Sequence, residues 1–106
     1  MATFHDDKLW QEAYVAWLDL LEATGDSGSD VVEQVRKHAM VVLTTIADGL
    51  GRRDRREHDT KLRDAGNMVV ALRSLLSVLW GQEVLTDEQL GKLDGAYEAL
   101  SGKLPK

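Results

Sequence analysis

Apolar residues recur every three or four positions in four separate stretches of this chain, and this spacing limits the folds that it can adopt. The clearest stretch runs from about residue 54 to residue 80, where the spacing holds without interruption. Its stripe consists of Leu62, Ala65, Val69, Leu72, Leu76 and Leu79. Such a stripe lies on one face of an α-helix, which must be buried against another element. The stretch therefore predicts one long amphipathic helix.

Three other stretches of the chain show the same spacing. They cover about residues 7–23, 30–49 and 87–103. Capping-box spacings, such as Thr86 with Gln89, stand near the expected helix starts. Pro105 is the only proline and follows the last stretch, and no segment alternates with the period of a strand. We therefore predict an all-α fold, an antiparallel up-down-up-down four-helix bundle, in a single domain over residues 1–106.

The connection between the second and third predicted helices contains two glycines. Gly49 and Gly51 are expected to give the backbone the freedom that a helix C-cap and a tight corner require. Asp54 stands three residues before Glu57, which is the spacing of a capping box. The Gly-x-Gly segment lacks the lysine and hydroxyl of a phosphate loop and follows a helix rather than a strand. The segment therefore predicts a helix–corner–helix.

The second and third predicted helices carry more apolar residues than one bundle seam can bury. A helix that is apolar over more than half its circumference usually has neighbours on both sides. We therefore expect a homo-oligomer, and its interface is expected to include Val31, Met40, Val41, Met68, Val70, Leu75, Val78 and Trp80. The alternative is a thicker core within one chain.

Positive charge is concentrated at the same corner, although the net charge of the chain is −5. The cluster consists of Arg52, Arg53, Arg55, Arg56, Lys61 and Arg63. It could contact a phosphate backbone, and an oligomer would repeat it around a ring. Alternatively, Glu57 with Lys61 and Asp59 with Arg63 are spaced for ion pairs along one helix. Both interpretations, nucleic-acid binding and a paired solvated face, stay open.

The sequence offers little for catalysis or for cofactor binding. The absence of cysteine excludes disulfides, thiol nucleophiles and thiolate metal sites. Residues 57–59 read Glu-His-Asp, but successive residues of a helix point about 100° apart and cannot converge as a triad. Neither Glu-x-x-His nor His-Glu-x-x-His occurs. We therefore expect no catalytic residues, no metal and no cofactor.

Three aromatic residues, Trp10, Tyr14 and Trp17, share one face of the first predicted helix. Large aromatic side chains usually serve as packing anchors, and a small-molecule pocket is the alternative.

Neither a membrane span nor a signal peptide is visible in the sequence. No apolar run reaches the length of a membrane span, and the N-terminus lacks the basic start and apolar core of a signal peptide. We therefore expect a cytoplasmic protein that has no membrane partner.

Four segments carry a family resemblance, and they include the basic and acidic stretch Arg53–Glu57 and the link Glu83–Gln89 before the last helix. Phe4 is followed by Leu-Trp-Gln-Glu-Ala at residues 9–13, and residues 41–52 read Val-Val-Leu-Thr-Thr-Ile-Ala-Asp-Gly-Leu-Gly-Arg. The chain resembles the bacterial 23S rRNA intervening-sequence proteins, which typically have an aromatic residue before Val-Trp-Gln-x-Ala. Their second helix ends in Ser-Ile-Pro-x-Asn-Ile-Ala-Glu-Gly-x-Gly-Arg. In this chain Leu43 replaces the proline, which should straighten the helix. Other departures are Val41, Thr45, Asp48 and, in the third helix, Ala71 in place of a glutamate.

This resemblance implies a homopentameric barrel of four-helix bundles but no defined activity. Related bundles are basic pentamers that bind the reverse transcriptase of diversity-generating retroelements and its RNA. We therefore predict a non-catalytic oligomeric scaffold or adaptor, whose basic corner faces an anionic partner. One alternative is a nucleic-acid-binding accessory protein of such a reverse transcriptase, with RNA or DNA as partner. The other is a small-molecule-binding bundle.

Overall fold

The computed structural model describes residues 3–106, which form four α-helices and no strand. The helices are α1 (Lys8–Thr24), α2 (Asp30–Leu50), α3 (Arg55–Gly81) and α4 (Asp87–Ser101), and a short 3-10 helix, η1 (Phe4–Asp6), precedes them. The all-α prediction is therefore confirmed. Each α-helix begins and ends within two residues of the range expected from the spacing of apolar residues.

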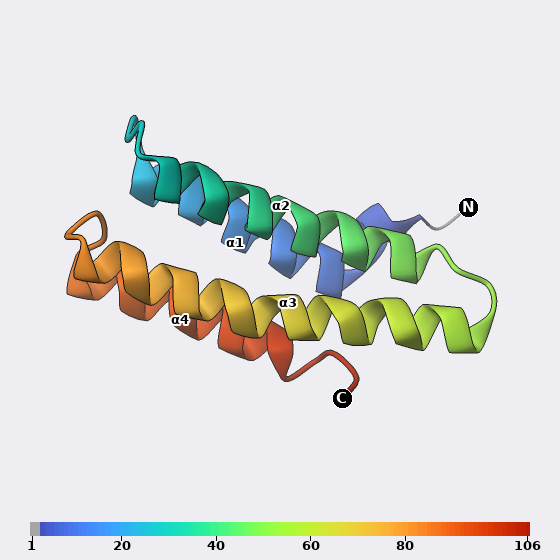
Figure 1. Ribbon diagram of the computed structural model, residues 1–106. Helices are drawn as coiled ribbons and strands as arrows, with labels where there is room; N and C mark the ends of the chain where they lie inside the picture. The colour runs from blue at the N-terminus through green and yellow to red at the C-terminus, as the bar shows by residue number, and fades with distance from the viewer. Residues whose placement is uncertain (1–2) are drawn as a thin grey trace.

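The four helices form an antiparallel bundle. Helix α2 packs against α1 and α3, and α4 packs against α3 and α1, so each helix has two neighbours. Figure 1 shows α1 behind α2 and α4 behind α3, with the α2–α3 corner at one end of the bundle. The α2–α3 contact is the most extensive, and the α1–α4 contact is the smallest of the four.

Side-chain caps fix where the helices begin. Asp7, Ser29, Asp54 and Thr86 precede the four helices, and each side chain accepts a hydrogen bond from a backbone N–H of the first turn. The capping box of Thr86 with Gln89 is complete. Helix α2 is capped by Ser29, and Asp30 is the first residue of the helix itself.

The α2–α3 corner does not depend on glycine in the way the sequence suggested. Gly51 has φ −83° and ψ −7°, and Gly25 is the only described glycine with a positive φ. A Cβ on Gly49 would instead lie 2.9 Å from Leu62 Cδ2 and 3.1 Å from Lys61 Cβ. Gly49 is therefore required because α2 and α3 approach each other closely there, and the expected backbone freedom is not used.

The left-handed residue at the end of α3 is Glu83, with φ 63°. The Val84 N–H donates to the carbonyl oxygen of Leu79 at 2.9 Å, as in a Schellman motif. Glycine is the residue that usually occupies this position, because a Cβ is strained there. Gly81 belongs to the helix and does not supply the left-handed turn.

The predicted stripes form the core. All six stripe residues of α3 are buried, and they meet apolar residues of the other three helices. Tyr97 of α4 is also buried, and its hydroxyl has no hydrogen-bond partner among the described residues. Burial raises the pKa of the Tyr97 hydroxyl, and Asp19 raises it further.

Two arginines connect neighbouring helices. Arg36 of α2 donates from Nη2 to Thr24 Oγ1 at 2.9 Å and to the Gly25 carbonyl at 2.6 Å, which satisfies the end of α1. Arg73 of α3 donates from Nε and Nη2 to the two carboxylate oxygens of Asp94, at 2.8 and 3.0 Å. These bonds tie α1 to α2 and α3 to α4.

Candidate interaction surfaces

An aromatic ladder runs from η1 along α1. The Phe4 and Trp10 rings meet edge to face at 5.3 Å between centroids. The Trp10 and Tyr14 rings stack at 5.1 Å, and the Tyr14 and Trp17 rings at 6.1 Å. The ladder packs η1 onto α1 and brings the three aromatic residues predicted to share a helix face into contact.

The ladder leads into an open apolar groove between α1 and α2, with a volume of about 480 Å³. Its apolar lining consists of Trp17, Leu21, Met40 and Val41. Lys37 lies at its edge, and no ion pair to Lys37 occurs within residues 3–106. A small molecule is usually bound in a more enclosed pocket, whereas a protein surface can cover an open groove.

A second open groove, of about 550 Å³, lies between α1 and α4. Its floor consists of Ala16, Ala96 and Ala99, with Val15 beside them. Charged side chains border it on both sides, namely Lys8, Glu12, Asp19 and Lys103. Small side chains make this face of the bundle hollow. Sequence reasoning did not identify this groove.

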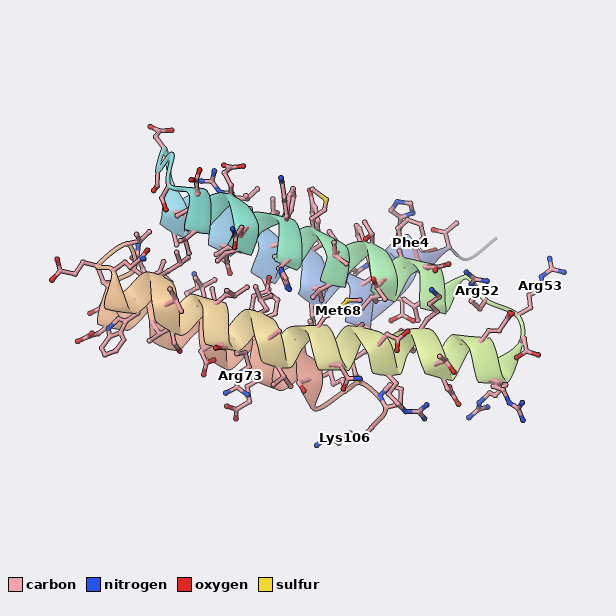
Figure 2. All side chains as sticks on the ribbon, viewed as in Figure 1. Phe4, Arg52, Arg53, Met68, Arg73 and Lys106 are labelled. Atoms are coloured by element: carbon pink, nitrogen blue, oxygen red, sulfur yellow. The ribbon has the colours of Figure 1, made fainter. Side chains whose placement is uncertain are left out.

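The eight residues expected at an oligomer interface do not share one surface. Val31, Met68 and Leu75 are partly buried against the core of their own bundle. Thr45 Oγ1 donates a hydrogen bond to Met68 Sδ at 3.8 Å, and Figure 2 shows Met68 between α2 and α3. These three residues contribute to packing within one chain.

The other five residues of that set are exposed and are divided between α2 and α3. They are Met40, Val41, Val70, Val78 and Trp80. Met40 and Val41 line the α1/α2 groove. The Trp80 indole N–H donates to Asp87 at 2.7 Å, at the start of α4. Met40 and Val41 therefore belong to a continuous apolar hollow, and Val41 also lines a smaller one with Met68.

Helix α1 exposes apolar residues that the sequence reasoning did not assign to an interface. Tyr14, Val15 and Leu18 are 38%, 54% and 41% exposed. Val15 and Leu18 fall outside the core stripe of α1, as Met40 falls outside that of α2. The argument used for the second and third predicted helices would have found them on the first.

The basic cluster at the α2–α3 corner is half neutralised. Arg52 Nε and Lys61 Nζ lie 3.1 and 3.6 Å from Asp48 carboxylate oxygens. Arg55 Nε lies 3.6 Å from Asp59. The expected pairs of Glu57 with Lys61 and of Asp59 with Arg63 do not form, because Asp48 and Arg55 take those partners. The hydrogen bond from Arg52 lowers the pKa of Asp48.

Arg53, Arg56 and Arg63 make no ion pair in the part of the chain that the structure describes, and all three are exposed. Figure 2 shows Arg53 extending from the corner away from the helices. These three guanidinium groups are the members of the predicted cluster that are available to an anion.

The Glu-His-Asp segment forms no triad. His58 Nδ1 lies 3.0 Å from Asp59 Oδ1, and this hydrogen bond lowers the pKa of Asp59. Glu57 donates its backbone N–H to the cap residue Asp54. Over residues 3–106, no three His, Asp or Glu side chains come together as a metal site would need. No helix of this described part is both long and apolar enough to cross a membrane.

In comparisons with known proteins, the chain matches no protein-family model, no curated protein and no solved structure. The likeness to the intervening-sequence proteins therefore rests on the quoted segments of the sequence, and the functions that it implies are proposals.

Proposed function

We propose that this protein is a non-catalytic scaffold that assembles from identical copies of the bundle and works in the cytoplasm. One observation carries the proposal: large apolar side chains stay exposed on α1, α2 and α3 although each helix also buries an apolar stripe in the core. They are Tyr14, Val15, Leu18, Met40, Val41, Val70, Val78 and Trp80. Met40 and Val41 line the α1/α2 groove and Val15 lines the α1/α4 groove, and exposed apolar surface gathered in this way on a small protein marks an interaction site. The resemblance to the intervening-sequence proteins suggests five copies.

The mass in solution tests this proposal. Sedimentation equilibrium or light scattering at micromolar concentration should give a stable multiple of the 11.8 kDa chain. Five copies would agree with the resemblance, and another closed number would keep the scaffold while correcting its size. A stable monomer would refute the proposal.

A second candidate function is contact with a nucleic acid, and the unpaired guanidinium groups of Arg53, Arg56 and Arg63 favour it. Arg53 lies in the α2–α3 corner and Arg56 and Arg63 follow it on α3, and a ring would repeat all three in every copy. Binding through phosphates weakens as salt rises, with a slope that reports the number of contacts. An accessory protein of a reverse transcriptase would use such contacts to hold RNA.

The matching experiment measures the binding of a single-stranded RNA oligonucleotide at several salt concentrations. Replacing Arg53, Arg56 and Arg63 by alanine should abolish binding. The control variant Arg52→Ala should retain most of it, because two hydrogen bonds hold that guanidinium on Asp48. Equal binding by the triple variant and the native protein would exclude this function and leave the scaffold proposal intact.

A further inference from the structure

We propose that, in the assembly proposed above, the α1/α2 groove of one copy packs against the α1/α4 groove of the next. Helix α1 then faces the centre of a closed ring. The inference rests on the proposed self-assembly, and it names the two surfaces that meet.

The two surfaces differ in the size of their apolar side chains. The α1/α2 face presents large apolar side chains, among which Met40 and Val41 are 44% and 46% exposed. The α1/α4 face is hollow over Ala96 and Ala99. Large side chains that enter a hollow lined by small ones give the close packing that stable interfaces have.

The two surfaces also lie at the same height along the bundle. Because α1 runs antiparallel to both neighbours, the groove contacts place Met40 and Val41 near the level of Trp17. They likewise place Ala96 near Ala16, one residue away from Trp17. Copies that are rotated about an axis parallel to the helices keep their heights, so the two surfaces meet in register.

The charges at the rims match in part, because Lys103 beside the α1/α4 groove is already paired with Glu12. Lys37 borders the α1/α2 groove without an ion pair among residues 3–106. On the α1/α4 side, Glu22 likewise has no ion pair in the described chain, and Asp19 has one long contact of 3.9 Å with Lys92. In the ring, Lys37 of one copy approaches Glu22 and Asp19 of the next. Opposite charges at the rim of an interface favour this register over others.

The geometry of the bundle allows the ring to close. Neighbouring sides of a four-helix bundle face about 90° apart, and both sides used here share α1. A cyclic ring needs contact sides about 90° apart for four copies and about 108° apart for five. The shared helix then faces the ring centre, which places Tyr14 and Leu18 there. Helix α3 faces outward with Val70, in contrast to the interface expected from sequence.

Engineered disulfides test this arrangement directly, because the chain has no cysteine. In the double variant Val41→Cys with Ala99→Cys, the two thiols lie on α2 and α4, at opposite corners of the bundle. A disulfide needs Cα atoms within about 7 Å, so any bond that forms joins two copies. The matched control is Val78→Cys with Ala99→Cys, because Val78 lies on the outward helix. The mass of each variant is measured under reducing conditions first, and circular dichroism reports its helix content.

The expected result after mild oxidation is a ladder of linked chains on a non-reducing gel. The ladder should end at the copy number of the native assembly, and the control should give no ladder. An assembled Val41→Cys/Ala99→Cys variant that forms no ladder would overturn the inference while leaving the scaffold proposal standing. A control that links as readily as the test variant would also overturn it. A monomeric native protein would refute both proposals.

Discussion

Replacing Gly49 by alanine should destabilise the bundle, although the same change usually stabilises a helix. The added methyl group would lie 2.9 Å from Leu62 Cδ2, 3.2 Å from Leu62 Cγ and 3.1 Å from Lys61 Cβ. The first atom is the end of a flexible side chain and can move. The other two lie close to the α3 backbone, so the helices themselves must separate.

Two opposing effects set the magnitude. Alanine in a helix is favoured over glycine by about 1 kcal/mol, and by less in the last turn, where Gly49 lies. Overpacking a tight contact costs about 1–3 kcal/mol. The overpacking cost is the larger effect, and we expect a net loss of about 1 kcal/mol.

Gly91 provides the matched control, because a Cβ there would meet nothing within 4 Å. Gly91→Ala in α4 should therefore stabilise the protein by about 1 kcal/mol. In a domain of this size, 1 kcal/mol corresponds to a Tm change of roughly 4–8 °C. Thermal unfolding followed by circular dichroism, at one protein concentration, should show the two Tm values moving in opposite directions. A rise in Tm for Gly49→Ala equal to that for Gly91→Ala would refute the reasoning.

Three further predictions concern other features of the fold. Arg36→Ala removes the hydrogen bonds that satisfy the end of α1. It should lower the free energy of unfolding, measured by urea denaturation, by about 1–3 kcal/mol. The control Gln34→Ala, at an exposed position of the same helix, should change it by less than about 0.5 kcal/mol. Equal effects would contradict this role. Glu83→Gly relieves a left-handed residue and should raise Tm, and a lower Tm would argue against strain there. The hydrogen bond from Arg73 lowers the pKa of Asp94 in the folded protein. The pair therefore stabilises the fold at pH values above the ordinary carboxyl pKa, and this stabilisation is lost as the pH falls through the lowered pKa of the folded state. Asp94→Asn should therefore flatten the loss of stability in acid, and an unchanged acid profile would be evidence against the pair.

The helices could be predicted from sequence because their signals are local. The stripe of α3 and the cap Thr86 depend on residues within a few positions of one another. The role of Gly49 could not be read in this way, because it depends on Leu62, which belongs to the next helix. The cap that Arg36 supplies to α1 likewise depends on how two helices pack.

The candidate surfaces were predicted less well, for the same physical reason. The basic cluster is contiguous in sequence, but its ion pairs were not predictable, because Lys61 reaches across to Asp48 on another helix. The α1/α4 groove depends on α1 and α4, which lie at opposite ends of the chain. Ala16 and Ala96 give no sequence signal by themselves, since alanine is common in any helix.

The small contact between α1 and α4 has a consequence for how the bundle opens. The other three helix contacts join consecutive segments, whereas this one closes a loop of nearly the whole chain and so has the highest entropic cost to form. The backbone amides of α1 and α4 along this contact should therefore exchange with solvent before those of α2 and α3 along theirs. A neighbouring copy seated over this seam would hold the two ends of the chain together, and amide exchange in α1 and α4 would then slow with protein concentration.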